Sequence, residues 1–431
     1  MTPLTFQQQW LWNLLRRHAG WNCLLPFALR ISGALQPDLL RRSFVELIER
    51  HEALRTRFLV IDRLERQCSS AACENQFERA SVADTAGSSG THAQARLLVE
   101  DFFRQGLDLA AGPPFKIKLL QLNDREHVLA VAMHHLVSDG FSASLLFREL
   151  WLLYGELVHG QPSPLSRIPM QYAEYALWQH ETNCAWQQKH APYWESRLAT
   201  AQRLQMPADE CGPARGCAGM QLHFDAPLSG QLLLLARQAG TRPAMVMLTV
   251  CVAVMAQWSR QKDFVLAFNV VGRHRPEHEH MIGYFPYFLL LRMQLQGDET
   301  FMALLRHVVH EFQQAYAHQD FGRLAARLPD LPRALFQWLP WMPDELDGIP
   351  SSAASRRSGV EVERFHFDFS GRPAALVDIA IQVADTPAGL CASFGYRADL
   401  FPAKTMDRLA QDLRTMSERF VRDPYARDIF G

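Results

Sequence analysis

One stretch of the chain combines local signals for a buried strand, a tight loop and a helix, in that order. Residues 128–132 are continuously apolar, as in a strand covered on both faces. Met133-His134-His135-Leu136-Val137-Ser138-Asp139-Gly140 follows, and a segment of helical apolar periodicity begins at Phe141. Asp and Gly favour turns and helix starts. We therefore expect an α/β protein with two adjacent histidines where a buried strand ends.

The two histidines are expected to play different roles. Side chains alternate along a strand, so His134 and His135 point to opposite sides, and one can face a cleft while the other packs. Asp139 has two possible roles, to orient an imidazole or to pair with a cation elsewhere in the chain. Gly140 lets the backbone approach a ligand closely. A histidine pair at a strand end is more often structural than catalytic, so these residues alone do not define a reaction.

Composition limits the possible partners and location of the chain. A chain of 431 residues is long enough for two or three domains, and its 48% apolar content can supply a substantial core. The 44 Lys and Arg residues nearly balance the 45 Asp and Glu residues. Without a basic excess, we expect no binding to nucleic acid or to an anionic membrane. The first residues do not resemble a signal peptide, and the longest apolar run, residues 245–256, is too short to span a bilayer. We expect a cytoplasmic protein.

Neither the cysteines nor the histidines predict a metal centre. The eight cysteines form no CxxC pair and have no zinc-ligand spacing, so we interpret them as free thiols. Three of the seventeen histidines, His274, His278 and His280, are close in sequence, and spaced imidazoles can bind metal. They lie among Arg, Pro and Glu residues, which is typical of a polar surface loop. We expect no metal site there.

Periodicity predicts alternating helices and strands along the chain. Helices are expected at residues 5–17, 37–50, 91–105, 142–159, 243–258, 301–317 and 403–421. Strands are expected at residues 26–31, 58–61, 115–122, 127–133, 264–269, 288–293, 335–340, 361–369, 376–383 and 389–396. Residues 69–90 are interpreted as a surface excursion, and residues 343–359 as a polar crossing segment.

Prolines mark a predicted boundary between two lobes. Pro162, Pro164 and Pro169 interrupt regular structure, because proline is excluded from the interiors of helices and sheets. We expect an N-terminal lobe at residues 1–168. Residues 169–431 are then a bridging helix, which begins near Tyr172, followed by a C-terminal lobe.

Several motifs together resemble one known family. The stretch His134–Gly140 resembles the HHxxxDG signature of the condensation domains of nonribosomal peptide synthetases, and residues 50–58, RHEALRTRF, match the family's RHExLRTxF motif at every fixed position. Residues 172–178, 282–285 and 318–321 resemble further family motifs. Pro286-Tyr287-Phe288 departs from the usual Val-Asn-Thr, and this difference leaves the shape of the acceptor side in doubt. The resemblance covers almost the full length.

The resemblance implies a fold and a reaction. Family members are α/β (α+β) proteins with two chloramphenicol acetyltransferase-like lobes, each a mixed sheet flanked by helices, and a tunnel between the lobes. The implied enzyme is an acyltransferase. It moves an acyl group from the phosphopantetheine thioester of an acyl or peptidyl carrier protein to an amine or hydroxyl, and so forms an amide or ester. We expect the carrier protein to act in trans, the acceptor to be a small free amine or alcohol rather than a carrier-bound one, and no metal or other bound cofactor.

The resemblance also assigns roles to individual residues. His135 is the implied catalytic base or positioning group, and a backbone N–H near Gly140 is the implied donor to the oxyanion. His134 has a structural role. Asp139 is expected to pair with an arginine of the second half, Arg273 in preference to Arg275. Gln337 is a weaker candidate for contact with the acceptor.

Other functions fit the sequence less well. A hydrolase is disfavoured because the sequence contains no GxSxG elbow. An epimerising relative is disfavoured because no EGHGRE-like motif occurs between Asp263 and Met281. Two alternatives stay open: an alcohol O-acyltransferase of the same superfamily, which makes polyketide or lipid esters, and a noncatalytic scaffold with a condensation-like fold.

Overall fold

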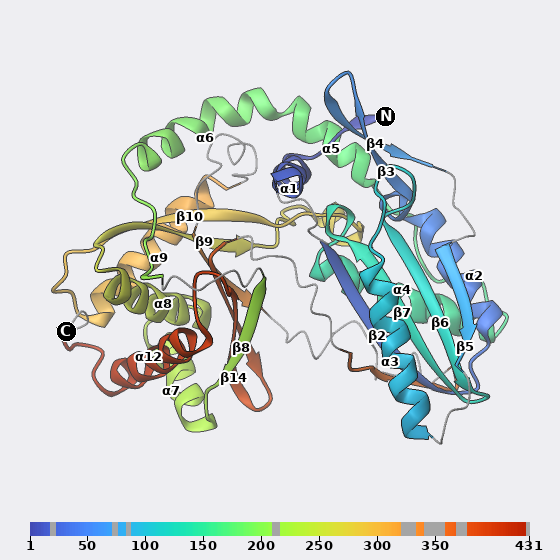
Figure 1. The fold of residues 1–431 in the computed structure, drawn as a ribbon. Helices are drawn as coiled ribbons and strands as arrows, with labels where there is room; N and C mark the ends of the chain where they lie inside the picture. Colours follow the sequence, from blue (N-terminus) through green and yellow to red (C-terminus); the bar gives the residue numbers. More distant parts are fainter. Residues whose placement is uncertain are drawn as a thin grey trace. The chain divides into compact units, whose positions relative to one another are not determined.

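The computed structural model describes residues 1–17, 23–70, 76–82, 88–208, 216–319, 333–339, 358–367 and 377–427. The chain divides into two compact units, each made of three segments (Figure 1). Unit 1 contains residues 1–183, 271–286 and 343–373, and unit 2 contains residues 184–270, 287–342 and 374–431. The single boundary expected after residue 168 therefore differs from this division. Residues 271–286, from the second half of the sequence, belong with the first half.

The main sheet of unit 1 has five strands in the order β12-β2-β7-β6-β5. These are β2 (Leu24–Gly33), β5 (Phe77–Ser81), β6 (Phe115–Asn123), β7 (Glu126–His134) and β12 (Val360–Arg364). β5 pairs parallel to β6, and the other neighbours are antiparallel. β7 is the central strand and is buried from His127 to His134. This explains the unbroken apolar run that precedes the histidine pair.

Helices cover both faces of this sheet. α2 (Pro37–Arg50) and α4 (Gly140–Val158) pack together, and Phe147 of α4 meets Phe27 of β2 edge-on at 5.4 Å between ring centroids. α3 (Ser88–Arg104) covers the opposite face, where Phe102 and Phe103 share a core with alternate residues of β7. The side chains on both faces of β7 are thus buried.

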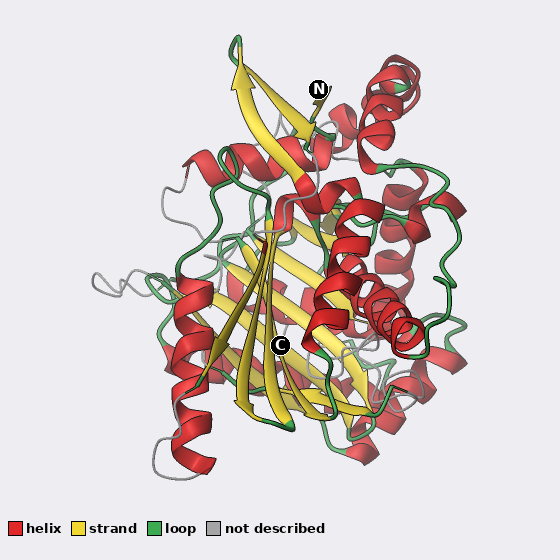
Figure 2. Cartoon of the chain, turned by 90° about the vertical axis from the view of Figure 1, so that its right-hand side faces the viewer, coloured by secondary structure: helices red, strands yellow, loops and turns green. Residues whose placement is uncertain are grey.

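Unit 1 also contains a small antiparallel sheet of β1 (Thr2–Pro3), β4 (Leu64–Ser69) and β3 (Thr56–Ile61). The β3–β4 hairpin turns at Asp62 and Arg63, whose φ angles of 51° and 65° give a left-handed turn, and Figure 2 shows it near the N-terminus. α1 (Phe6–Arg17) begins at a capping box, in which the Thr5 hydroxyl accepts from Gln8 N–H and Gln8 Oε1 accepts from Thr5 N–H. Thr5, the first residue of the helix expected at residues 5–17, therefore caps α1.

Two predictions for unit 1 need correction. Residues 69–90 were expected to be a surface excursion, but they contain the edge strand β5 and the start of α3. No residue of β5 is fully buried, so the strand carries no hydrophobic alternation that periodicity could detect. The helix expected to bridge the lobes, α5 (Tyr172–Glu181), lies wholly in unit 1. The division between the units falls instead at the start of α6 (Asn183–Leu198).

Unit 2 is built on a six-stranded mixed sheet in the order β10-β9-β11-β13-β14-β8. The strands are β8 (Cys217–His223), β9 (Asp263–Val270), β10 (Tyr287–Gln294), β11 (Ala334–Leu339), β13 (Ile379–Thr386) and β14 (Gly389–Arg397). β11 runs parallel to both of its neighbours, and the remaining pairs are antiparallel. The predicted mixed sheet flanked by helices is confirmed in both units. The predicted polar crossing segment lies almost entirely outside the described residues.

Helices of unit 2 share a core with its sheet, among them α7 (Ala226–Gln238), α8 (Pro243–Ser259), α9 (Phe301–Ala317) and α12 (Ala403–Arg422). Every residue of α8 from Ala244 to Ala256 is buried. No single helix in the described ranges is long and apolar enough to cross a membrane. Only α7 and α8 taken together meet that criterion, and they are bent by 107°.

Candidate active site

The two histidines lie where β7 ends, and their backbones are held from opposite sides. His134 N–H donates to the Pro114 carbonyl at 2.9 Å, and His135 N–H donates to the Cys23 carbonyl at 2.9 Å. Pro114 precedes β6 and Cys23 precedes β2, the two neighbours of β7. The two backbone N–H groups thus donate toward the two opposite neighbours of β7. His134 is buried, whereas His135 is partly exposed.

His134 holds the loop that follows the strand. Its Nδ1 accepts from Leu136 N–H at 3.1 Å, and its carbonyl accepts from the Ser138 hydroxyl at 2.9 Å. Burial, with a smaller contribution from His135, lowers the pKa of His134 to about 3. The ring is therefore neutral at pH 7, with its proton on Nε2. These contacts suit the structural role expected for His134.

His135 has one ring nitrogen occupied and one available. Nδ1 lies 2.9 Å from the Ser138 carbonyl, which can only accept, so Nδ1 carries the proton and Nε2 keeps its lone pair. Burial lowers the pKa of His135 below its usual 6.5, against the opposing effects of the Ser138 carbonyl and the Asp139 carboxylate. Nε2 has no hydrogen-bond partner within the described ranges. The side chain is a neutral imidazole with a free basic nitrogen.

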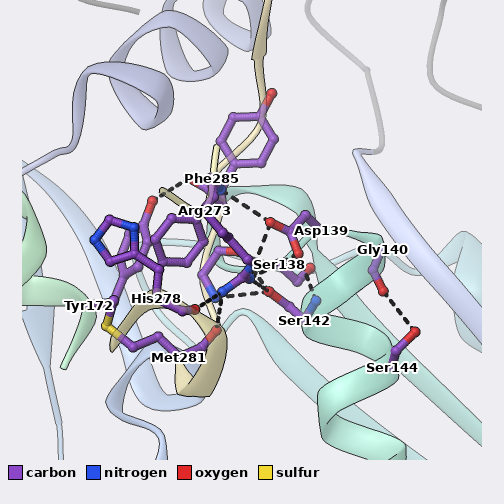
Figure 3. A network of polar contacts seen from close by, with 12 residues as sticks. Ser138, Asp139, Gly140, Ser142, Ser144, Tyr172, Arg273, His278, Met281 and Phe285 are labelled. Carbon is purple, nitrogen blue, oxygen red and sulfur yellow. Dashed lines mark hydrogen bonds and ion pairs between the residues drawn. The ribbon is translucent and has the colours of Figure 1, made fainter. Parts of the chain in front are cut away.

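Asp139 pairs with Arg273 (Figure 3). Arg273 Nη2 lies 3.2 Å from Asp139 Oδ1 and 3.4 Å from Oδ2, and both side chains are 3% exposed. Asp139 Oδ1 also accepts from Ser142 N–H at 2.7 Å, which caps α4, and Oδ2 accepts from Phe285 N–H at 3.2 Å. The predicted ion pair is present. A hydrolase-like arrangement, with Asp139 bonded to the histidine, is absent from the described residues.

Arg273 joins the histidine loop to residues 271–286. Its Nη1 donates to the carbonyls of Met281, at 2.9 Å, and His278, and its Nη2 donates to the Ser142 hydroxyl at 2.8 Å. The guanidinium lies against the rings of Phe141 and Phe285, at 4.4 and 4.0 Å from their centroids. A planar fork with aromatic faces beside it suits arginine specifically.

The arginine that was the second choice pairs elsewhere. Arg275 forms a partly exposed ion pair with Glu277 at 3.5 Å and lies over the ring of Trp178. Arg273, the arginine expected to pair with Asp139 in preference to Arg275, is thus its partner.

The prediction of a polar surface loop at residues 274–280 is wrong for His278. His274 and His280 are exposed, but His278 is 2% exposed and packs against the rings of Tyr175 and Phe285. Both of its ring nitrogens are buried without a hydrogen-bond partner, and burial lowers its pKa to about 4. In the part of the chain that the structure describes, no group of three or more His, Cys, Asp or Glu residues could hold a metal ion.

Sequence reasoning missed three residues of this site: Ser142, Tyr172 and Tyr284. The Ser142 hydroxyl donates to the Gly283 carbonyl at 2.8 Å and accepts from Gly283 N–H at 3.1 Å. The Tyr172 hydroxyl donates to the Tyr284 carbonyl. Ser142 lies three residues after the capping Asp139, so helix geometry could have placed its side chain near the cap. The other two lie within recognised motifs, but nothing in a single sequence brings those motifs together.

Gly140 and Gln337 complete the predicted set. Gly140 is exposed and begins α4, and no described residue accepts a hydrogen bond from its N–H. An unpaired N–H in the first turn of a helix can stabilise a developing negative charge. Gln337 lies on β11 of unit 2, where its Oε1 accepts from Gln382 Nε2 at 3.2 Å. The catalytic and binding roles assigned to these residues stay predictions.

These features define a class: a two-unit α/β protein, with one mixed sheet in each unit and a paired-histidine loop at the end of a central buried strand. The family model that describes condensation domains matches residues 1–428. The chain belongs to the condensation domain family.

Curated relatives are much longer than this chain. It is 33% identical over 423 residues to one of the subunits of linear gramicidin synthase of Brevibacillus parabrevis, an alignment that covers 95% of this chain and 5% of that protein. It is 30% identical over 433 residues to isonitrile lipopeptide synthase of Mycobacterium tuberculosis, covering 96% of this chain and 17% of that protein. The chain thus spans one domain-sized part of such synthases.

Solved structures confirm the fold. The X-domain from teicoplanin biosynthesis is similar with a TM-score of 0.85 at 22% identity, covering 99% of this chain and 96% of that one. The first condensation domain of the calcium-dependent antibiotic synthetase, solved with a substrate analogue, is similar with a TM-score of 0.77 at 18% identity, covering 99% and 98%. The same fold therefore occurs in an X-domain and in a condensation domain.

Proposed function

We propose that this chain is an acyltransferase that joins a carrier-bound acyl thioester to an amine, as condensation domains of nonribosomal peptide synthetases do. The observation that carries the proposal is the state of His135. The Ser138 carbonyl fixes the proton on Nδ1, so the basic Nε2 is available to a substrate.

The proposed step requires one proton acceptor and one site for negative charge. The acceptor nitrogen attacks the thioester carbonyl, a C–N bond forms, and the C–S bond breaks. His135 Nε2 takes the proton from the attacking nitrogen and returns it to the departing pantetheine thiolate. The unpaired N–H of Gly140 donates to the oxygen that becomes negative during the attack. The pantetheine belongs to the carrier protein, so the step needs no resident cofactor.

Asp139 and Arg273 contribute by holding the loop. Their carboxylate and guanidinium neutralise each other, and both carboxylate oxygens also accept backbone N–H groups, so Asp139 is not placed to take the substrate proton. The contacts fix the start of α4 next to His135. Effective catalysis depends on such fixed geometry, because reactants held in register avoid the entropic cost of alignment.

The test is a reconstituted transfer reaction. The purified chain is incubated with an acyl-loaded carrier protein supplied in trans and an amine, presented either free or on a second carrier, and products are identified by mass spectrometry. We expect amide formation that His135→Ala abolishes and that His280→Ala, a change at an exposed histidine, leaves intact. Full activity of a folded His135→Ala protein contradicts the proposal.

The same experiment separates the alternatives. An alcohol supplied in place of the amine tests for ester formation by an O-acyltransferase. Product that forms only from a carrier-bound acceptor contradicts the preference for a free one. A noncatalytic scaffold yields no product from any pair. The retained His135 with its free Nε2 favours a catalyst over that scaffold.

A further inference from the structure

We propose that Tyr284 is a positioning residue that holds the imidazole of His135 in the plane in which Nε2 can reach a substrate. The inference rests on the proposed function of His135 and adds a residue to it. Tyr284 is the third residue of the segment Ile282-Gly283-Tyr284-Phe285. Its ring meets that of His135 edge to face, with centroids 5.7 Å apart and an interplanar angle of 72°.

His135 needs a second constraint besides its hydrogen bond. The bond from Nδ1 to the Ser138 carbonyl restrains one ring nitrogen, but small rotations about the Cα–Cβ and Cβ–Cγ bonds can still swing the ring. Such a swing moves Nε2, which lies on the opposite side of the imidazole. The edge-to-face contact with Tyr284 restricts this rotation.

Tyr284 can restrict the motion of the His135 ring because the backbone is held at three successive residues, 283–285. The Ser142 hydroxyl bonds to both the N–H and the carbonyl of Gly283. The Tyr172 hydroxyl donates to the Tyr284 carbonyl, and Phe285 N–H donates to Asp139 Oδ2. Tyr284 itself is 5% exposed. The contacts of the histidine loop with residues 283–285 therefore fix the ring that faces His135.

The surroundings of Tyr284 keep its side chain uncharged. Burial raises the pKa of its phenol, with further contributions from Cys23, Tyr172 and Asp139. The nearby Cys23 thiol is protonated as well, because burial raises its pKa to about 12. Asp139 is the charged neighbour, and Arg273 neutralises it. The contact that Tyr284 offers to His135 is thus apolar packing by the ring.

Three variants test this role: Tyr284→Leu removes the ring, Tyr284→Phe keeps it, and Phe27→Leu removes a ring that packs on Phe147. The first readout is nitrogen NMR of imidazole-labelled protein without substrate, which reports the tautomer and pKa of His135. The second is the separation of kcat from KM, with the pH dependence of kcat/KM. Circular dichroism and thermal unfolding establish that each variant is folded.

We expect Tyr284→Leu to mix the two tautomers of His135, to raise its pKa toward 6.5 as water reaches the ring, and to lower kcat by about 10- to 100-fold with little change in KM. Tyr284→Phe should restore all three, and Phe27→Leu should change none. A folded Tyr284→Leu protein with an unaltered His135 titration and tautomer overturns the inference, as does a Tyr284→Phe protein as defective as Tyr284→Leu. The NMR result stands without any transfer activity, so failure of the proposed function is distinguished from failure of this inference.

Discussion

At the scale of single residues, the surrounding backbone selects different tautomers for two neighbouring histidines. Nδ1 of His134 accepts a hydrogen bond, whereas Nδ1 of His135 donates one. The two rings therefore carry their protons on different nitrogens, although both are neutral at pH 7. The difference comes from the short turn at residues 135–137, which places an N–H beside one ring and a carbonyl beside the other.

The lowered pKa of His135 predicts the pH dependence of transfer. A base must be unprotonated, and burial keeps the pKa of His135 below 6.5, so activity should rise with pH to a plateau, and the midpoint of the rise should lie below pH 6.5. The measurement is kcat/KM between pH 5 and 8 with an acceptor whose own pKa lies outside that range. An acid limb centred above pH 6.5 would show that the assigned base is wrong.

The buried His278 predicts loss of stability in mild acid. Its pKa is about 4 in the folded protein and near 6.5 when unfolded, so the unfolded chain binds the proton first. Stability is full above pH 6.5 and falls as the pH drops toward 4, by up to about 3 kcal/mol from this residue. Urea unfolding at pH 7 and pH 4.5 should show a smaller loss in His278→Phe. His280→Ala, at an exposed position, should behave like the unaltered protein.

At the scale of elements, the N-terminus of α4 is held by a segment from far along the chain. Asp139 caps the helix and pairs with Arg273, which also donates to two carbonyls of residues 271–286. A buried charge without its partner is costly, so these contacts are expected to matter together rather than singly.

Breaking this pair should be strongly destabilising and non-additive. Asp139→Asn and Arg273→Gln should each lower the free energy of unfolding by about 3 to 5 kcal/mol, because each leaves an uncompensated buried charge. The double variant should lose less than the sum of the two, by about 1 to 3 kcal/mol. Arg275→Gln, at a partly exposed pair, should cost under about 1 kcal/mol. Simple additivity in denaturant unfolding would argue against coupling.

Gly272, just before Arg273, predicts a second sensitive position. Its φ is +74°, and a Cβ there would lie 2.0 Å from the Phe285 carbonyl oxygen. Gly240 has a similar φ of +64° with nothing within 4 Å of such a Cβ. Gly240→Ala should therefore show backbone strain alone, about 1 kcal/mol, and Gly272→Ala should be clearly less stable in thermal unfolding. Equal losses would mean that the backbone near Phe285 yields to the added methyl.

At the scale of the whole molecule, local sequence predicted the elements better than their grouping. The apolar run of β7, the capping Asp139 and the pairing with Arg273 could all be predicted, because a buried strand, a helix cap and a family motif each leave a sequence signal. The edge strand β5 and the burial of His278 could not, since the first has no apolar alternation and the second sits among polar residues. The placement of residues 271–286 in unit 1 depends on contacts across the chain, which periodicity does not report.

The distance along the chain between Asp139 and Arg273 has a consequence for synthesis. The two residues are 134 positions apart, so at roughly 5 to 20 residues per second a ribosome adds the arginine about 7 to 27 seconds after the aspartate. Throughout that interval the first half of unit 1 has a helix cap without its cation, and β2 has an open edge until β12 arrives later still. The N-terminal segment of a nascent chain stalled at residue 183 should therefore be cleaved readily by protease, whereas the same segment should resist in the full-length chain. Equal resistance would show that this segment folds before its later contacts exist. Translation speed over the second half of the gene then sets how long an unfinished domain is exposed to chaperones and aggregation.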